Sequence, residues 1–302
     1  MLSATGGCTS SRAIPDARTE LAAAIAAIRG HDLYAANVDW STAIPQANAV
    51  LASAAATAPS AAYLPISDLL VGLGDKHAQL LHPGVPTAPG FDPTGPLPSV
   101  KVAGSTAILT LPGWVGPVSS SQPYARAAWR AVAATSPACG WVLDLTGNEG
   151  GDLWPMLAAT EPFLTLGQPI GATTAGQPPK MFTVDAGTVT DNNDHQAYGT
   201  PPPRVHGPVA VLIGPRTESS GEWLALALQS NPAVRTFGAP TAGVPTSPVW
   251  YALPDGAHLE LSVSAATDIH GHEYTTALQP ERATPIPLAD AEQWLIAQCS
   301  TP

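Results

Sequence analysis

The fold is decided by a short apolar stretch, Trp141-Val142-Leu143-Asp144-Leu145, and by the small residues that follow it, Thr146-Gly147-Asn148-Glu149-Gly150-Gly151. A near-continuous apolar run of this length is typical of a strand that is buried on both faces of a sheet. A helical stretch, 153–164, comes next, and Pro155 lies near its start, where proline is tolerated. The segment therefore predicts a strand, a glycine-containing loop and a helix, in that order.

The same order is repeated along the chain. Strands are predicted at 106–111 and 209–213, and helices at 124–134, 223–228 and 288–298. Strand–helix alternation of this kind is typical of an α/β layered core. The turn Pro254-Asp255-Gly256 joins two alternating runs, 250–253 and 257–263, and predicts a hairpin. Residues 186–207 are polar and rich in turn residues, so we expect them to form an excursion on the surface.

The N-terminal part has a different pattern. Apolar residues recur at helical spacing between residues 16 and 81, for example at Leu21, Ile25 and Ile28. Residues 85–98 are rich in proline and glycine without any apolar period, which marks a linker. The sequence thus predicts a helical subdomain at 10–84, a linker at 85–99 and an α/β core at 100–302.

Composition excludes several classes of partner. The chain has 302 residues, a formal net charge of −11 and only twelve Lys and Arg, so no basic stripe that could follow a phosphate backbone can be assembled. We therefore expect neither nucleic acid nor an anionic membrane surface as a partner. No apolar run approaches the roughly 20 residues that span a bilayer, and a soluble chain without a transmembrane segment is expected.

Three cysteines, Cys8, Cys139 and Cys299, lie far apart and lack the paired spacing of a zinc site or a redox motif. A disulfide between two of them is left open, and neither a metal nor a cofactor is expected. The start, 1–8, ends as a lipoprotein cleavage site would, but it lacks the charged and apolar stretches of a signal peptide. A secreted or cell-envelope location is compatible with this start, and the compartment is left open.

Two loops could carry chemistry. Gly150 and Gly151 allow backbone N–H groups to converge on a ligand, as an oxyanion hole requires. In the other loop, Ser219 precedes a helix, where free amides and the helix dipole stabilise negative charge on an attacking oxygen. The alternatives are a plain strand-to-helix turn at the glycines and a helix cap at Ser219, with Glu222 completing a capping box.

A serine hydroxyl is a poor nucleophile until a base removes its proton. Of the eight histidines, His195 and His206 fall in the polar excursion, and His270 and His272 are expected on the surface. His77 follows an amphipathic helix at the domain junction, which makes it the best candidate base. A histidine at a helix end also commonly has a purely structural role.

Several ordered motifs resemble the C-terminal-processing (tail-specific) serine peptidases, and within them the tricorn-like members without a PDZ domain. The motifs are Val38-Asp39-Trp40, Leu73 to His77, Gly140 to Gly151, Leu153 to Leu157, Val209 to Glu222, Phe237 to Gly243 and Leu253-Pro254-Asp255-Gly256. The resemblance implies a crotonase-like α/β core with a helical N-terminal part. A PDZ domain would lie between these parts, where the linker is too short to contain one.

The resemblance also implies roles for particular residues. It places the nucleophile at Ser219 and the oxyanion hole at Gly150, Gly151 and the amide of Ser220. Many members use a lysine as the base, but Val244 stands at that position here, and the tricorn-like branch implies His77 instead. Lys76 precedes His77 where that branch has a serine.

The acid that would orient His77 is assigned to Glu273, with Asp268 in reserve. Glu222 is expected to cap its helix or to hold the local backbone.

We therefore expect a serine peptidase that hydrolyses peptide or protein substrates through an acyl-enzyme on Ser219, with His77 as the general base. The alternatives are a non-catalytic binder of a lipophilic small molecule on the same fold, as in interphotoreceptor retinoid-binding proteins, and a serine esterase or acyltransferase. The sequence leaves the substrate sequence and the oligomeric state open.

Overall fold

The computed structural model describes residues 15–54, 57–87, 95–117, 120–137, 139–165 and 167–299. The chain divides into two compact units. The first comprises Met1–Thr87 and Val249–Leu261, and the second comprises Ala88–Pro248 and Ser262–Pro302. The expected helical subdomain did not include residues 249–261. Cys8 lies outside the described residues.

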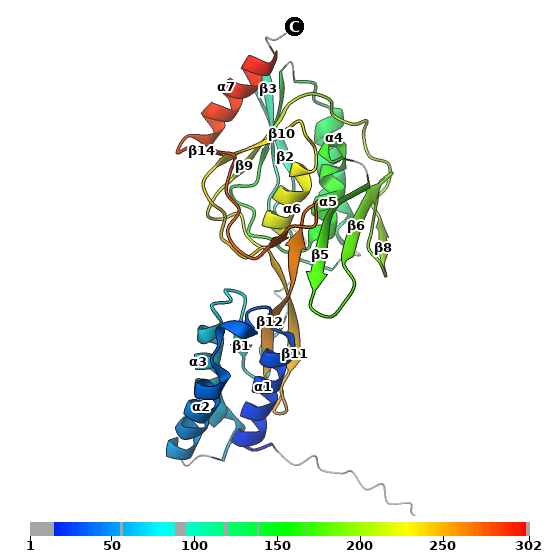
Figure 1. Cartoon of the computed structure of the whole chain (residues 1–302). Coiled ribbons are helices and arrows are strands. Elements are labelled where there is room, and N and C mark those ends of the chain that lie inside the picture. The colour runs from blue at the N-terminus through cyan, green and yellow to red at the C-terminus, as the bar shows by residue number, and fades with distance from the viewer. Residues whose placement is uncertain are drawn as a thin grey trace, which may run out of the picture. The chain divides into compact units, whose positions relative to one another are not determined.

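Three helices form most of the first unit (Figure 1). They are α1 (Ala17–His31), α2 (Trp40–Ala54) and α3 (Tyr63–Leu73), accompanied by the 3₁₀ turns η1 (Ala35–Asn37) and η2 (Pro59–Ala62). Asp16 caps α1 by accepting a hydrogen bond from the Thr19 amide at 2.8 Å. Leu21 and Ile28 of α1 are buried against Ile66 and Leu73 of α3, as the helical spacing predicts.

A short strand and a hairpin complete the first unit. The strand β1 (Gln79–Leu81) pairs antiparallel with the first half of β12 (His258–Thr267), and β12 also pairs with β11 (Thr246–Ala252). The predicted hairpin is confirmed. The helical prediction is wrong at 79–81, which form a strand. The helix α3 already ends at Leu73, because Gly74 after it adopts a left-handed conformation with φ 71°.

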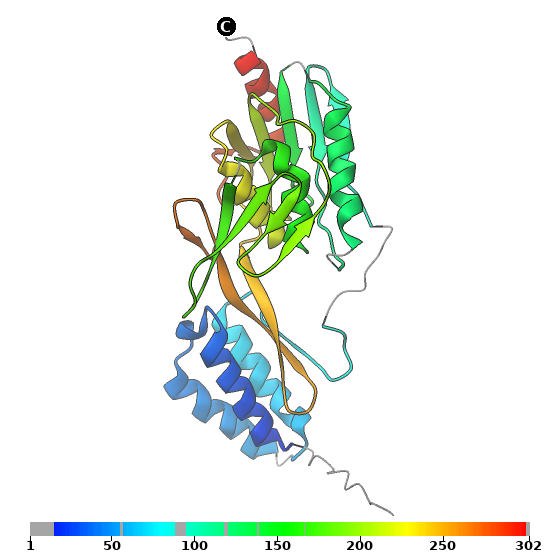
Figure 2. The same ribbon diagram turned by 90° about the vertical axis from the view of Figure 1, so that its right-hand side faces the viewer.

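A six-stranded sheet lies at the centre of the second unit (Figure 2). Its order is β14-β10-β9-β4-β3-β2, and every pairing is parallel except that of β2 with β3. The strands are β2 (Ser99–Ala103), β3 (Thr106–Thr110), β4 (Gly140–Asp144), β9 (Val209–Ile213), β10 (Val234–Gly238) and β14 (Arg282–Ala283).

Helices cover both faces of this sheet. The side chains of β9 are apolar on both faces, so each face must be buried. Val209, Val211 and Ile213 point into the core formed with α4 (Gln122–Ala133), α5 (Leu153–Thr160) and α6 (Ser220–Gln229). Ala210 and Leu212 pack with α7 (Pro287–Cys299) on the opposite face. The 3₁₀ turn η4 (Glu161–Phe163) follows α5. The predicted α/β class is confirmed.

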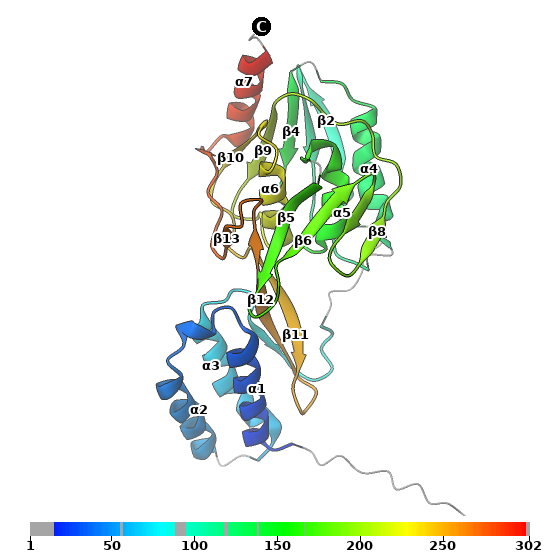
Figure 3. The same ribbon diagram turned by 45° about the vertical axis from the view of Figure 1, so that its right-hand side comes forward.

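A second sheet was not predicted. It contains β5 (Gly167–Thr174), β6 (Lys180–Asp185), β7 (Thr188–Thr190) and β8 (His195–Ala197), with the end of β12 on β5 and with β13 (Glu273–Tyr274) on β12 (Figure 3). The predicted surface excursion at 186–207 is right for most of its residues, which are exposed or half-buried, but it missed β7, β8 and the full burial of Val189 and Tyr198. The error arose because strands of three residues show no readable alternation.

Cys139 and Cys299 form a disulfide, which joins the start of β4 to the end of α7 within the second unit. The spacing of the cysteines alone leaves this pairing open. Among the described helices, none has both the length and the apolar character needed to cross a bilayer.

Candidate active site

Two loops of the second unit lie side by side because they follow neighbouring parallel strands. β4 and β9 pair in register, with Asp144 opposite Leu212, so the loops 145–152 and 214–219 leave the same edge of the sheet. The Leu145 amide donates to the Leu212 carbonyl at 3.0 Å, and the Thr217 hydroxyl donates to the Leu145 carbonyl at 2.8 Å. These bonds fix the loop with the glycines beside the loop with Ser219.

Asn148 connects the two loops from inside. Its side chain is fully buried and donates to the Leu111 carbonyl at 3.0 Å. Its Oδ1 accepts the Gly150 amide at 3.0 Å, and its backbone carbonyl accepts the Glu218 amide at 3.0 Å. Asn148 therefore holds the backbone on both sides of the candidate site.

The two glycines are required by close packing. A Cβ at Gly150 would lie 2.9 Å from the Cβ of Ser219, and one at Gly151 would lie 2.0 Å from the Trp114 carbonyl oxygen. Both also have positive φ, at 87° and 110°. The Trp114 backbone holds this loop from the other side, through Trp114 N to Gly150 O at 3.1 Å and Asp152 N to Trp114 O at 2.7 Å.

Ser219 has a strained backbone. Its φ of 51° and ψ of −120° fall in a region that a non-glycine residue rarely adopts, at a cost of about 1–3 kcal/mol. It immediately precedes α6, and its amide donates to Glu222 Oε2 at 3.1 Å. Strain of this kind persists only where the surroundings fix it, and it is concentrated at functional sites. The Ser219 turn therefore has features of both a helix cap and a nucleophile turn.

The Glu222 carboxylate fixes the strained backbone of Ser219. It is fully buried and accepts four hydrogen bonds: from Ser219 N, from Gly243 N at 3.0 Å, from Val244 N at 2.8 Å and from the Thr241 hydroxyl. The Thr241 oxygen already accepts the Leu278 amide, so its proton is available for Glu222. Burial raises the pKa of Glu222, and the four donors oppose that shift. Glu222 thus ties the Ser219 turn to segment 241–244.

Two backbone amides beside Ser219 remain available. In the part of the chain that the structure describes, neither Gly151 N–H nor Ser220 N–H makes a hydrogen bond. The Ser220 hydroxyl donates to the Gly151 carbonyl at 2.6 Å, which brings the two residues together. The Gly150 amide, which the resemblance also implied, already donates to Asn148. The N–H groups of Gly151 and Ser220 could therefore bind an oxyanion, whereas that of Gly150 is already bonded.

Asp152 is a second unusual carboxyl group at this edge. It caps α5, with Oδ1 accepting the Trp154 amide at 3.0 Å, while its Oδ2 is buried and has no hydrogen-bond partner among the described residues. Burial raises the pKa of Asp152 to about 6. A carboxyl group with a buried oxygen and a raised pKa thus follows directly after Gly151.

The predicted base belongs to the other unit. His77 is half-buried, lies after α3, and its amide donates to Asp75 Oδ1 at 3.0 Å. Its role as the base of Ser219 stays a prediction.

The two predicted acids are in the second unit, near the end of β12. Glu273 is exposed on β13 and pairs through its backbone with Thr267. Asp268 accepts the amides of His270 and His272 and the Tyr274 hydroxyl, at 2.8, 3.0 and 3.0 Å. Burial raises the pKa of Asp268, but these bonds outweigh it and the pKa lies below its usual range. No hydrogen bond between described residues joins either carboxylate to Ser219.

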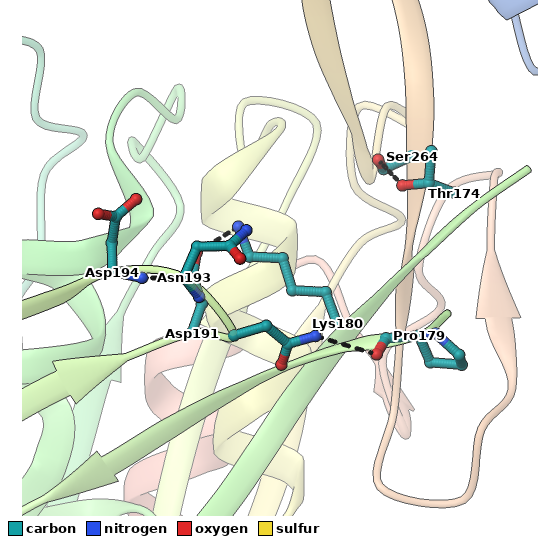
Figure 4. Close-up of polar contacts among 8 residues, drawn as sticks. Thr174, Pro179, Lys180, Asp191, Asn193, Asp194 and Ser264 are labelled. Carbon is teal, nitrogen blue, oxygen red and sulfur yellow. Dashed lines mark hydrogen bonds and ion pairs between the residues drawn. The ribbon is translucent and has the colours of Figure 1, made fainter. Parts of the chain in front are cut away.

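The two lysines of the second unit are poor candidates for a catalytic base. Lys180 of β6 forms an ion pair with Asp191, whose carboxylate also accepts the amides of Asn193 and Asp194 at 2.8 Å (Figure 4). Lys101 is exposed on β2. At the position where the resemblance implied a lysine, Val244 is buried and its amide binds Glu222.

Three further residues that shape this site were not predicted. Asn148, Thr217 and Thr241 are buried polar side chains that hold loop backbone. Their signal in the sequence was weak, because asparagine and threonine are ordinary in loops and each has at least one partner that lies 19 to 72 residues away.

Comparison with known proteins decides the family. The sequence model of peptidase family S41 matches residues 105–283, which is more than half of the chain. The chain belongs to peptidase family S41. Peptidase family S41 is a family of serine peptidases. The predicted resemblance to the C-terminal-processing peptidases is confirmed.

The S41 peptidase is similar to a nisin-resistance protein of Lactococcus lactis subsp. lactis, with 27% identity over 202 residues. That match covers 67% of this chain and 63% of the relative, so the chain spans less than two thirds of it.

A lipoprotein from Streptococcus agalactiae has a TM-score of 0.71 at 21% identity, covering 94% of this chain and 97% of the other. The photosystem II D1 C-terminal processing protease has a TM-score of 0.57 at 14% identity, covering 92% and 97%. At such identities the likeness concerns the fold.

Proposed function

We propose that Ser219 is the nucleophile of a peptidase that works through an acyl-enzyme, with His77 as the general base. The observation that carries the proposal is the Ser219 turn itself. A non-glycine residue at φ 51° stands at the N-terminus of a helix, beside two free amides. A helix cap alone does not require such a conformation, because capping residues ordinarily lie in the extended region.

The first step would form the acyl-enzyme. Ser219 Oγ attacks the peptide carbonyl carbon while its proton passes to His77, and the oxyanion is bound by the amides of Gly151 and Ser220. The C–N bond then breaks, and His77 gives its proton to the leaving amine. Water, deprotonated by His77, attacks the acyl carbon; the bond from that carbon to Ser219 Oγ then breaks, and His77 returns the proton to Ser219 Oγ. Glu273, or Asp268 in reserve, would orient the imidazole.

The proposed framework is a crotonase-like catalytic core in the second unit, with the helical subdomain that supplies His77 in the first. The domain division proposed from the sequence, 10–84, 85–99 and 100–302, is kept, with residues 249–261 added to the first part. With His77 as its base, this peptidase would belong to the tricorn-like branch, where a histidine of the N-terminal part is the base.

A fluorophosphonate probe tests the proposal. The intact chain should be labelled on Ser219, and Ser219→Ala and His77→Ala should each abolish labelling. Ser136→Ala, an exposed serine in a loop, is the matched control and should be labelled as the wild type is. Circular dichroism establishes that each variant is folded. Full labelling of a folded Ser219→Ala or His77→Ala variant would contradict the assignment of that residue.

A further inference from the structure

A carboxyl group in the first unit is buried without enough donors to keep it charged. Glu20 of α1 has 0% of its surface exposed, and its Oε1 makes no hydrogen bond to an N–H or O–H donor of the described residues. Its Oε2 accepts a single bond, from the Asp255 amide at 3.2 Å. An isolated buried carboxylate is costly, and it takes up a proton instead.

The acceptor for that proton is another carboxylate. Asp255 lies in the turn between β11 and β12, its backbone amide bonds to Glu20, and its carboxylate is near enough to raise the pKa of Glu20. Asp255 is held in its charged form by the Tyr63 hydroxyl at 2.5 Å and by the Ala257 amide at 2.8 Å. A proton on Glu20 therefore satisfies the atom that otherwise has no partner, and it removes the repulsion between the two carboxylates.

We propose that Glu20, Asp255 and Tyr63 form a proton-dependent clasp, which fastens the tip of the β11–β12 hairpin to α1 and α3 in acid and releases it in alkaline solution. The clasp is independent of the chemistry proposed for Ser219. It would act as a conformational device of the first unit.

The shifts in pKa agree with this arrangement. Burial, and then the hydrogen bond to Asp255, raise the pKa of Glu20 to about 7. The pKa of Asp255 lies below its usual range, because bonds from Tyr63, Ala257 and Glu20 outweigh its burial. Since the Glu20 pKa is raised above its unfolded value, the closed clasp is favoured at low pH and loses its advantage as the pH rises through 7.

The surrounding groups do not offer another explanation. On α1 the neighbouring charges are Asp16 and Arg18, which interact with each other. On α3 the other acid, Asp68, is exposed, and on the hairpin the other titratable group near the tip is His258. The Tyr63 ring packs on His82 at 4.7 Å. The segments α2, η1 and η2 contain no charged residue.

Hydrogen exchange of the full chain, followed by NMR at single amides, tests the clasp. The amides of Asp255 and Ala257 should lose protection on the order of tenfold between pH 5 and pH 8, after correction for the intrinsic pH dependence of exchange. Glu20→Gln keeps the shape of the protonated acid and cannot ionise, so its protection should be the same at both values. Asp68→Asn is the matched control and should behave as the wild type does.

Asp255→Asn provides a second test, since it removes the charge that Glu20 faces. It should lose part of the pH dependence, while the part that comes from the burial of Glu20 stays. A wild-type hairpin with equal protection at pH 5 and pH 8 would overturn the proposal, as would an equal loss in Glu20→Gln or Asp255→Asn. Loss of the pH dependence in Asp68→Asn would assign it to another carboxylate and overturn the proposal as well.

Discussion

Glu20 in the first unit and Glu222 in the second are both fully buried, but their surroundings differ. Glu222 accepts bonds from four donors, three of them backbone amides, and none of its partners needs a proton from it. Glu20 has one donor and faces the carboxylate of Asp255. Burial raises the pKa of both groups, but the four donors oppose that shift at Glu222, whereas the neighbouring carboxylate of Asp255 adds to it at Glu20.

The difference shows that burial alone does not define what a carboxyl group does. Donors around a buried carboxylate make it a rigid support for backbone, as at the Ser219 turn. A second carboxylate in place of the donors makes the pair sensitive to pH, because two neighbouring charges cannot both be kept. Replacing each glutamate by glutamine separates the two cases, since the amide keeps the shape but cannot accept hydrogen bonds at its nitrogen.

The largest effect is expected from Glu222→Gln. The amide nitrogen would face two donors without accepting from either, so at least two buried donors lose their partner. At about 1–3 kcal/mol each, the free energy of unfolding should fall by roughly 4 kcal/mol. Urea unfolding measures the loss, and activity should fall with it because Ser219 N loses its anchor.

Glu218→Gln, on the same turn, is the control for this change, because its side chain makes no hydrogen bond to the described residues. Its free energy of unfolding should match that of the wild type. A Glu222→Gln variant as stable as Glu218→Gln would mean that Glu222 is not the rigid support described above.

The disulfide lies wholly in the second unit, so its removal should destabilise that unit and leave the first unit unchanged. Cys139→Ser with Cys299→Ser should lower the free energy of unfolding of that unit by about 3 kcal/mol, because the bond closes a loop of 160 residues. A reducing agent should destabilise the wild type by a similar amount and leave the double variant unchanged. The pH dependence at Asp255 should be the same in all cases.

How far the sequence predicted these features depends on the range of the interactions. Strand β4, the loop 146–151 and the position of Ser219 before a helix followed from local pattern and turn chemistry. Asn148, Thr241 and the Glu20–Asp255 pair did not, because each acts on residues that lie far away in the chain, 235 positions in the case of Glu20 and Asp255. A buried polar pair has no period in the sequence that would reveal it.

A third effect concerns Asp152, whose hydrogen bonding is intermediate between that of Glu222 and that of Glu20. One of its carboxylate oxygens accepts a single bond, and the other has no partner among the described residues. Its folded pKa of about 6 is raised by burial above the unfolded value, so its contribution to stability is lost as the pH rises through 6. Asp152→Asn keeps a good helix cap without the charge. At pH 8 the variant should be more stable than the wild type by roughly 2 kcal/mol, and at pH 4 nearly equal.

Asp16→Asn controls for the change of residue type at a helix cap. Asp16 also caps a helix, but hydrogen bonds from Thr19 lower its pKa, so this variant should gain no stability at pH 8. A gain at pH 8 in Asp16→Asn as large as that in Asp152→Asn would refute the explanation through burial.

The smallest effect is expected from Tyr63→Phe, which removes one neutral donor from Asp255 while the ring stays in place. A single hydrogen bond of this kind contributes about 1 kcal/mol, and its loss should appear in urea unfolding at pH 6. Tyr251→Phe, on the same hairpin, keeps its stacking on His31 at 4.6 Å and loses a hydroxyl that bonds to no described residue, so it should be neutral. Because the Asp255 carboxylate would then have one donor fewer and be a stronger acceptor, its hold on the Glu20 proton should strengthen, and the loss of hairpin protection should begin at a higher pH than in the wild type. An unchanged midpoint in Tyr63→Phe would show that Tyr63 supports the hairpin without taking part in the titration.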